Sequence, residues 1–182
     1  MARRFAPLLA ARALRSGWLI AHQSDTLPGI AALANDPTSL RRLTQFKQRQ
    51  APFLLLISHR SILRRLCIRL NPMMRQTIRR HWPGAVTLIF PASSRTPTGC
   101  RYRGGVAVRW IDDPATQRMV AAAGGAVLSS SLNRKGESPR APCWKMRYRW
   151  HRYHIAPFSD EGIHRAASTL IDLRGNSPKR LR

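Results

Sequence analysis

The sequence predicts an α/β fold (α+β in some classification schemes), in which helices flank a mostly buried, mixed β-sheet. Short apolar runs alternate along the chain with segments that have helical periodicity, which favours a layered arrangement of strands and helices. The 182 residues, 43% of them hydrophobic, are enough for one core and few for two. We find no internal repeat and no linker. We therefore expect a single domain over residues 1–182.

The first 24 residues contain no acid, and arginines alternate there with apolar side chains. This pattern is typical of an amphipathic transit peptide. It also fits a first helix of the domain with Phe5, Leu8, Leu9 and Arg12 on one face and Gly17 at its end. We prefer the helix, because a strand-like segment follows it directly.

Helix starts are marked by a capping side chain followed by proline. Asp36-Pro37, Asn71-Pro72 and Asp113-Pro114 have this form, and a further helix is expected over 61–68. The second helix ends near Lys47, the fourth at about residue 81 before the break Trp82-Pro83-Gly84, and the fifth at Gly124-Gly125. The apolar runs predict strands at 18–21, 53–57, 85–90, 106–110, 126–128 and 168–173. Loops are expected over 22–34 and 91–105, and 134–165 shows little periodicity.

The charge of the chain is strongly positive. Lys and Arg number 32 against 8 acids, which gives a net charge of +24, and 28 of the bases are arginine. Such a chain attracts polyanions, so RNA or nucleotide phosphate is the expected partner. The alternative is that the arginines reflect composition alone and lie scattered over solvated faces.

Three widely spaced cysteines indicate free thiols in a reducing compartment, and hence a cytoplasmic protein. No His/Cys group has zinc spacing, so we expect no structural metal. The longest apolar run, Phe53 to Ile57, is far shorter than the roughly 20 residues of a membrane-spanning helix. We therefore expect no membrane segment.

Three polar clusters fall at the ends of predicted strands and helices, where α/β sheets place their ligand sites. They are Ser24-Asp25-Thr26 with Gly29, Lys47-Gln48-Arg49, and Ser129 to Asn133. Each has an ordinary reading as a polar turn or as cations at a helix end. The usual phosphate-loop, dinucleotide and nucleophile-elbow motifs do not occur. The residues alone thus indicate a phosphate-binding α/β protein.

The order of these clusters resembles the YrdC/TsaC family of threonylcarbamoyl-AMP synthases, over about residues 8–139. The matching segments are His22–Gly29 (HQSDTLPG), Lys47–Arg49 (KQR), Trp82–Thr87 (WPGAVT), Ala107–Arg109 (AVR), Ser129–Asn133 (SSSLN) and the outlying Ser168–Asp172 (STLID).

The resemblance implies a twisted mixed sheet with a deep basic cavity. It implies a nucleotidyltransferase that makes threonylcarbamoyl-AMP and pyrophosphate from L-threonine, bicarbonate (or CO2) and ATP. Mg²⁺ would be held mainly by the phosphates. The product would serve the t6A modification of adenosine 37 in tRNA, through a downstream threonylcarbamoyl transferase complex; direct contact with tRNA is left open.

The same resemblance implies a set of site residues. The central ones would be Lys47, Arg49, Ser131 and Asn133. The residues expected to bind the substrates or ATP are Ser24, Asp25, Thr26, Gly29, Thr87, Arg109 and Ser129.

The chain departs from the family pattern at several positions, among them Pro28 before Gly29, Gln50 after the K-x-R segment, and Leu132 in place of a small alanine. We expect Leu132 to add bulk where the nucleotide lies. Together with the arginine excess, it favours an alternative, a catalytically degenerate protein of the same fold that binds RNA. The paired K-x-R and S-x-N residues favour the enzyme, because an RNA-binding protein does not need both.

Overall fold

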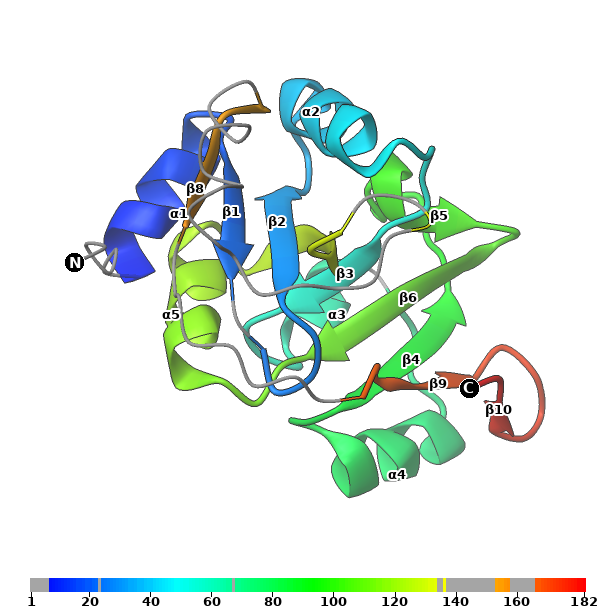
Figure 1. Cartoon of the computed structure of the whole chain (residues 1–182). Helices are drawn as coiled ribbons and strands as arrows, with labels where there is room; N and C mark the ends of the chain where they lie inside the picture. Colours follow the sequence, from blue (N-terminus) through cyan, green and yellow to red (C-terminus); the bar gives the residue numbers. More distant parts are fainter. Residues whose placement is uncertain (1–6, 23, 67, 134–135, 137–152, 158–165) are drawn as a thin grey trace.

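The fold is a single mixed sheet with helices on both faces (Figure 1). The computed structural model describes residues 7–22, 24–66, 68–133, 136, 153–157 and 166–182. The strands of the described chain are β1 (Leu19–His22), β2 (Gly29–Leu33), β3 (Leu54–Ile57), β4 (Val86–Pro91), β5 (Arg101–Tyr102), β6 (Gly105–Trp110), β7 (Ala126–Ser131), β8 (Ile155–Pro157), β9 (Thr169–Asp172) and β10 (Lys179–Arg180). The helices are α1 (Pro7–Arg15), α2 (Pro37–Lys47), α3 (Ile62–Arg65), α4 (Pro72–His81), α5 (Pro114–Ala122) and the 3₁₀ turn η1 (Thr98–Cys100).

The strand order is β10-β9-β4-β6-β3-β7-β2-β1-β8, and β5 pairs with β6 beside this path. β1 pairs with β8, β3 with β6 and β4 with β9 in parallel. The other pairs are antiparallel. The mixed sheet flanked by helices, which the sequence predicts, is confirmed.

Two hydrophobic cores lie on opposite faces of the sheet, because successive side chains of a strand point to opposite sides. In β3, Leu55 and Ile57 join the larger core, which contains side chains of α2, α3 and α4. Leu56 joins the smaller core beneath α1 and α5, two helices that contact each other at the β1–β8 end of the sheet (Figure 1). The rest of this second face carries the cavities described below.

The predicted helix starts are confirmed, since each cap forms locally. Asp36 accepts bonds from the amides of Thr38 (3.3 Å) and Ser39 (2.8 Å). Asn71 and Asp113 cap α4 and α5 in the same way, through the amides three residues further on. Because these caps need only neighbouring residues, sequence reasoning finds them reliably.

The first helix is present, but its predicted buried face is wrong. Leu8 and Leu9 are 69% and 53% exposed, whereas Ala10, Ala11 and Leu14 are buried. Small alanine side chains let α1 approach α5 closely, so this face packs in place of the bulkier one. Phe5 lies outside the described residues.

Five other predictions about elements need correction. Residues 22–34 are not one loop, because β2 occupies their second half. The segment 91–105 contains η1 and the short strand β5. The segment 134–165, read without elements, includes β8, and β9 is followed by a further strand, β10. β7 also runs on through the serines to Ser131 rather than ending at Leu128.

Within the described chain, no helix combines the length and apolarity that crossing a membrane requires. Cys100 is a free, buried thiol, and burial raises its pKa to about 12. The predicted state of Cys67 and Cys143 concerns residues outside the described part.

Candidate functional site

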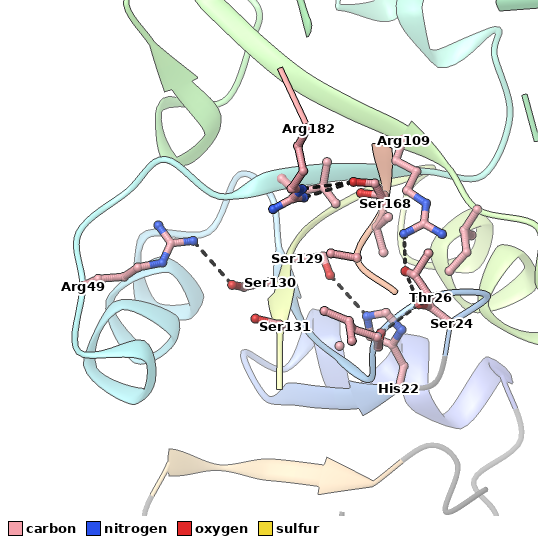
Figure 2. A pocket seen from close by; sticks show the side chains of 16 residues that line it. His22, Ser24, Thr26, Arg49, Arg109, Ser129, Ser130, Ser131, Ser168 and Arg182 are labelled. Carbon is pink, nitrogen blue, oxygen red and sulfur yellow. Dashed lines mark hydrogen bonds between the residues drawn. The ribbon is translucent and has the colours of Figure 1, made fainter. Parts of the chain in front are cut away.

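A cavity of about 280 Å³ lies on the sheet face that also carries α1 and α5 (Figure 2). Leu56 lines it and also packs in the smaller core, which places the cavity on that face. Its polar walls come from the loop after β1, the end of β7, the segment before β3, and the C-terminal region. The lining residues are His22, Ser24, Thr26, Leu27, Gly29, Arg49, Leu54, Leu56, Arg109, Ile111, Ser129, Ser130, Ser131, Ala167, Ser168 and Arg182.

Arg109 of β6 is 4% exposed and ties the loop after β1 to the sheet. Its Nη1 donates to Thr26 Oγ1 at 2.6 Å, its Nε donates to the Gly84 carbonyl at 3.1 Å, and its Nη2 forms an ion pair with Asp25. Burial lowers the pKa of Arg109, while Asp25 opposes that change. An arginine keeps its charge under such conditions, so the cavity has a fixed cation in its wall.

The loop between β1 and β2 is shaped by its own hydroxyls. Ser24 Oγ accepts from the Thr26 amide at 3.0 Å and donates to the Leu27 carbonyl at 2.8 Å. Behind it, His22 Nε2 lies 3.3 Å from Ser129 Oγ. A Cβ on Gly29 would lie 2.6 Å from two atoms of the His22 ring, so only glycine leaves room for the imidazole there.

Lys47 is the last residue of α2, and its side chain contacts the end of β7, outside the lining of the cavity. Its side chain is buried, and its Nζ donates to the Ser131 carbonyl at 2.7 Å and to Asn133 Oδ1 at 3.2 Å, as well as to the Asn133 carbonyl. The lysine thus holds the strand end that presents the Ser131 hydroxyl.

Arg49 does line the cavity. Its Nη1 donates to the Pro52 carbonyl at 2.8 Å, and its Nη2 lies 3.4 Å from Ser130 Oγ. The guanidinium also stands over the Phe53 ring, 4.6 Å from its centroid. Burial lowers the pKa of Arg49, and these contacts fix a second cation at the cavity wall, opposite Arg109 in Figure 2.

A second cavity of about 420 Å³ adjoins the first and shares Leu54, Ser168 and Arg182 with it. Its walls are more apolar and include Phe53, Ile89, Ala107 and Leu170. At the boundary, Arg182 donates through Nε and Nη2 to the Ser168 carbonyl, both at 3.2 Å. The first, polar cavity and the second, more apolar cavity therefore meet at Arg182.

The structure brings together seven of the eleven residues that the resemblance implied. Those that line the first cavity are Ser24, Thr26, Gly29, Arg49, Arg109, Ser129 and Ser131. Thr87 lines the second cavity, where its hydroxyl lies 2.9 Å from Ser168 Oγ. The remaining three, Asp25, Lys47 and Asn133, contact lining residues and are not themselves in the walls.

Sequence reasoning missed four polar lining residues: His22, Ser130, Ser168 and Arg182. Three of them stand in segments that the motifs marked, and Arg182 lies beyond the last of these segments, Ser168–Asp172. The expectation for Leu132 is wrong. Its side chain is fully buried in the larger core and lines neither of these two cavities, so its bulk does not narrow them.

Among the residues that the structure describes, no three His, Cys, Asp or Glu side chains are grouped so as to hold a metal ion. The carboxylate nearest the first cavity, Asp25, is engaged by Arg109. The polar side chains that line the first cavity are therefore mainly hydroxyls and guanidinium groups.

Comparison with known proteins gives consistent results. The family model Sua5/YciO/YrdC, described as "Telomere recombination", matches residues 12–182. The threonylcarbamoyl-AMP synthase of Thiobacillus denitrificans is 33% identical over 165 residues, which cover 88% of this chain and 87% of that protein.

Solved structures agree in fold. P. abyssi Sua5 complexed with L-threonine superposes with a TM-score of 0.81 at 26% identity, over 97% of this chain and 53% of the Sua5 chain. The chain therefore spans about half the length of that protein. E. coli YciO has the same fold, with a TM-score of 0.81 at 19% identity, over 97% of this chain and 87% of its own.

Proposed function

The chain belongs to the Sua5/YciO/YrdC family, and on that premise we propose that it is a threonylcarbamoyl-AMP synthase. The curated relatives named for this activity are 28–33% identical to it. We propose L-threonine, bicarbonate or CO2, and ATP as the substrates, and threonylcarbamoyl-AMP and pyrophosphate as the products. The enzyme is then a nucleotidyltransferase that supplies the t6A modification of tRNA.

The pair of adjoining cavities is the observation that carries this proposal. The smaller one offers hydroxyls and arginines for the carboxylate, carbamate and phosphate groups, and the larger one offers apolar walls for a nucleoside. Arg182, at their boundary, lies where a phosphate joining the two halves would sit. Figure 2 shows the polar half, with Arg49, Arg109 and Arg182 around the serines.

The reaction requires two anions to approach each other. The threonine amine first takes up CO2 and loses a proton to form a carbamate. A carbamate oxygen then attacks the α-phosphorus of ATP, the bond from that phosphorus to the bridging oxygen breaks, and pyrophosphate leaves. Because both reactants are negative, positioning and fixed cations contribute most of the rate enhancement.

The residues divide this work. We propose that Arg49, Arg109 and Arg182 neutralise the carboxylate and phosphates, and that Ser24, Thr26, Ser129 and Ser131 hydrogen-bond their oxygens. Lys47 brings a further positive charge and holds Ser131 and Asn133 in place, through the bonds described above.

Mg²⁺ is proposed to arrive with the triphosphate. A cavity that has one nearby carboxylate, already paired with an arginine, suits a cation carried by phosphates better than one bound by the protein. The threonylcarbamoyl group would pass to a downstream transferase complex that acts on tRNA.

The alternative, a degenerate protein that only binds RNA, loses one of its two arguments. Leu132 packs in the core and leaves the cavities open. The arginine excess remains, and it is compatible with an enzyme.

The test measures pyrophosphate release by the purified chain with ATP, Mg²⁺, bicarbonate, and L-threonine present or omitted. We expect release that depends on both threonine and bicarbonate. Arg49→Ala should reduce it by about a hundredfold or more, the effect of removing one fixed charge from the transition state. The control is Arg118→Ala, an exposed arginine on α5, which should release pyrophosphate at the parent rate. No threonine-dependent release from folded protein would refute the proposal.

A further inference from the structure

Exposed arginines are concentrated in α3, α4 and the residues beside them, on the sheet face opposite the cavities. From 60 to 80 the chain has seven arginines in 21 positions, all exposed, whereas the whole chain has 28 in 182. These residues, here called the α3–α4 arginine surface, are Arg60, Arg64, Arg65, Arg69, Arg75, Arg79 and Arg80.

The position of this surface follows from the packing beneath it. Leu63 of α3 and Met74 and Ile78 of α4 are buried in the larger core. In β3, Leu55 joins that core and Leu54 lines both cavities. In β4 and β6, Leu88 and Val108 join the core, whereas Ile89 and Ala107 line the second cavity. The arginines therefore lie outside the proposed catalytic machinery and do not serve its anionic substrates.

The surface has no acidic partner nearby in the chain. No Asp or Glu occurs from residue 37 to residue 111. Of the five acids in the described chain, Asp36 and Asp113 cap helices, and Asp25 and Asp172 pair with Arg109 and Arg174. The fifth, Asp112, is exposed between β6 and α5. On α4 itself, Arg75 and Arg79 stand one turn apart, where like charges repel. A bound polyanion would relieve this repulsion.

The composition of the surface selects the kind of partner. The exposed residues between the arginines are short or polar, as at Ser61, Asn71 and Gln76, and the large exposed hydrophobic side chains of the described chain all lie elsewhere. A membrane surface would require an apolar helix face, and a protein interface would usually present aromatic anchors. A surface of guanidinium groups without such apolar or aromatic side chains suits phosphates, which guanidinium groups bind in a bidentate manner.

We propose that the α3–α4 arginine surface binds the phosphate backbone of RNA, on the side of the molecule opposite the two cavities. The choice of RNA rests on the proposed role in tRNA modification. With RNA on this surface, the cavities stay open to ATP and threonine. Binding through phosphates would depend little on base sequence and strongly on salt.

The test compares two triple variants by fluorescence anisotropy with an unmodified tRNA transcript, from about 50 to about 200 mM KCl. R75Q/R79Q/R80Q changes the surface, and R12Q/R95Q/R118Q removes the same charge from exposed arginines elsewhere. We expect the first to weaken binding at least about tenfold and to reduce the salt slope by about 3, near one unit per lost phosphate contact. The control should keep the parent slope to within about one unit.

Equal weakening in both variants would show that only net charge matters, and it would overturn the proposal, as would a parent chain that binds no RNA. R75K/R79K/R80K keeps the charge and loses the bidentate contacts, so its affinity should lie between those of the parent and of the glutamine variant. A loss as large as with glutamine would also contradict the proposal. Pyrophosphate release should be normal in all three variants. The two proposals can therefore fail separately, because one is read from pyrophosphate and the other from RNA affinity.

Discussion

Replacing Asp25 by asparagine should destabilise the protein markedly, because it removes the charge that faces a buried guanidinium. The Arg109 side chain is 4% exposed and that of Asp25 is 12% exposed. Burial already lowers the pKa of Arg109, and Asp25 is the group that opposes this. Asparagine keeps an acceptor oxygen and loses the charge, so the arginine stays buried without its counterion.

The expected size follows from the contacts that remain. Removing one partner of a buried ion pair costs about 3–5 kcal/mol. Here Arg109 keeps its bonds to Thr26 and to the Gly84 carbonyl, so we expect a smaller cost than this, about 2–3 kcal/mol. For a chain of this length that corresponds to a fall in Tm of roughly 4–12 °C.

The assay is urea unfolding followed by circular dichroism, together with a thermal scan. Asp172→Asn is the matched control, because its partner Arg174 is 35% exposed and such pairs contribute about 0–1 kcal/mol. If the free energy of unfolding of Asp25→Asn lies within about 0.5 kcal/mol of the parent value, the Asp25–Arg109 ion pair does not stabilise the fold, and the reasoning about the cavity wall is refuted.

Three further predictions concern single residues. Asp36→Ala should cost about 1 kcal/mol at neutral pH. The Ser39 hydroxyl lowers the pKa of Asp36 below 3.8, so this stabilisation is present above that value and is lost as the pH falls through the pKa of the folded state. If the urea midpoints of the parent and the variant differ by the same amount at neutral and at acid pH, this explanation is contradicted. Cys100, whose pKa burial raises to about 12, should resist iodoacetamide in the native chain at pH 8.5 and react in urea, as read by mass spectrometry of its peptide; rapid native labelling would show that the thiol is accessible. Gly29→Ala should lower the free energy of unfolding by about 1–3 kcal/mol, because the new Cβ crowds the His22 ring. Adding His22→Ala should recover part of that stability in urea unfolding. A double variant no more stable than Gly29→Ala would exclude this contact as the cause.

Sequence reasoning predicted the parts of the fold that depend on neighbouring residues. Asp36 and Asn71 cap helices through amides two or three positions away, and the patterns there were sufficient. β2 was missed because Gly29 to Leu33 is rich in alanine and glycine, which favour strands weakly. Its conformation comes from pairing with β1 on one side and β7 on the other, which local sequence does not reveal.

In the candidate site, too, sequence reasoning found what depends on local motifs and missed what depends on distant strand pairing. The order of motifs indicated the loop around Ser24 and the strand end around Ser131, and the structure brings these two segments to one cavity. Arg182 could not be placed, because its position depends on β9 pairing with β4 and β10 pairing with β9. Leu132 was misplaced for a related reason. Whether a side chain enters a cavity or a core depends on which face of the sheet it meets, and spacing within a motif does not determine that.

The pairing of β2 with β7 sets Gly29 opposite Ser131 and Ala31 opposite Ser129. Since strand side chains alternate between faces, a shift by one residue would turn Ser129 toward the larger core and Leu128 toward the cavity. A single residue inserted beside Leu128 would thus exchange the side chains that β7 presents to the two faces, although every original residue is retained. We expect insertions to be absent from this short stretch in functional homologues and tolerated in the exposed turn at Gly104.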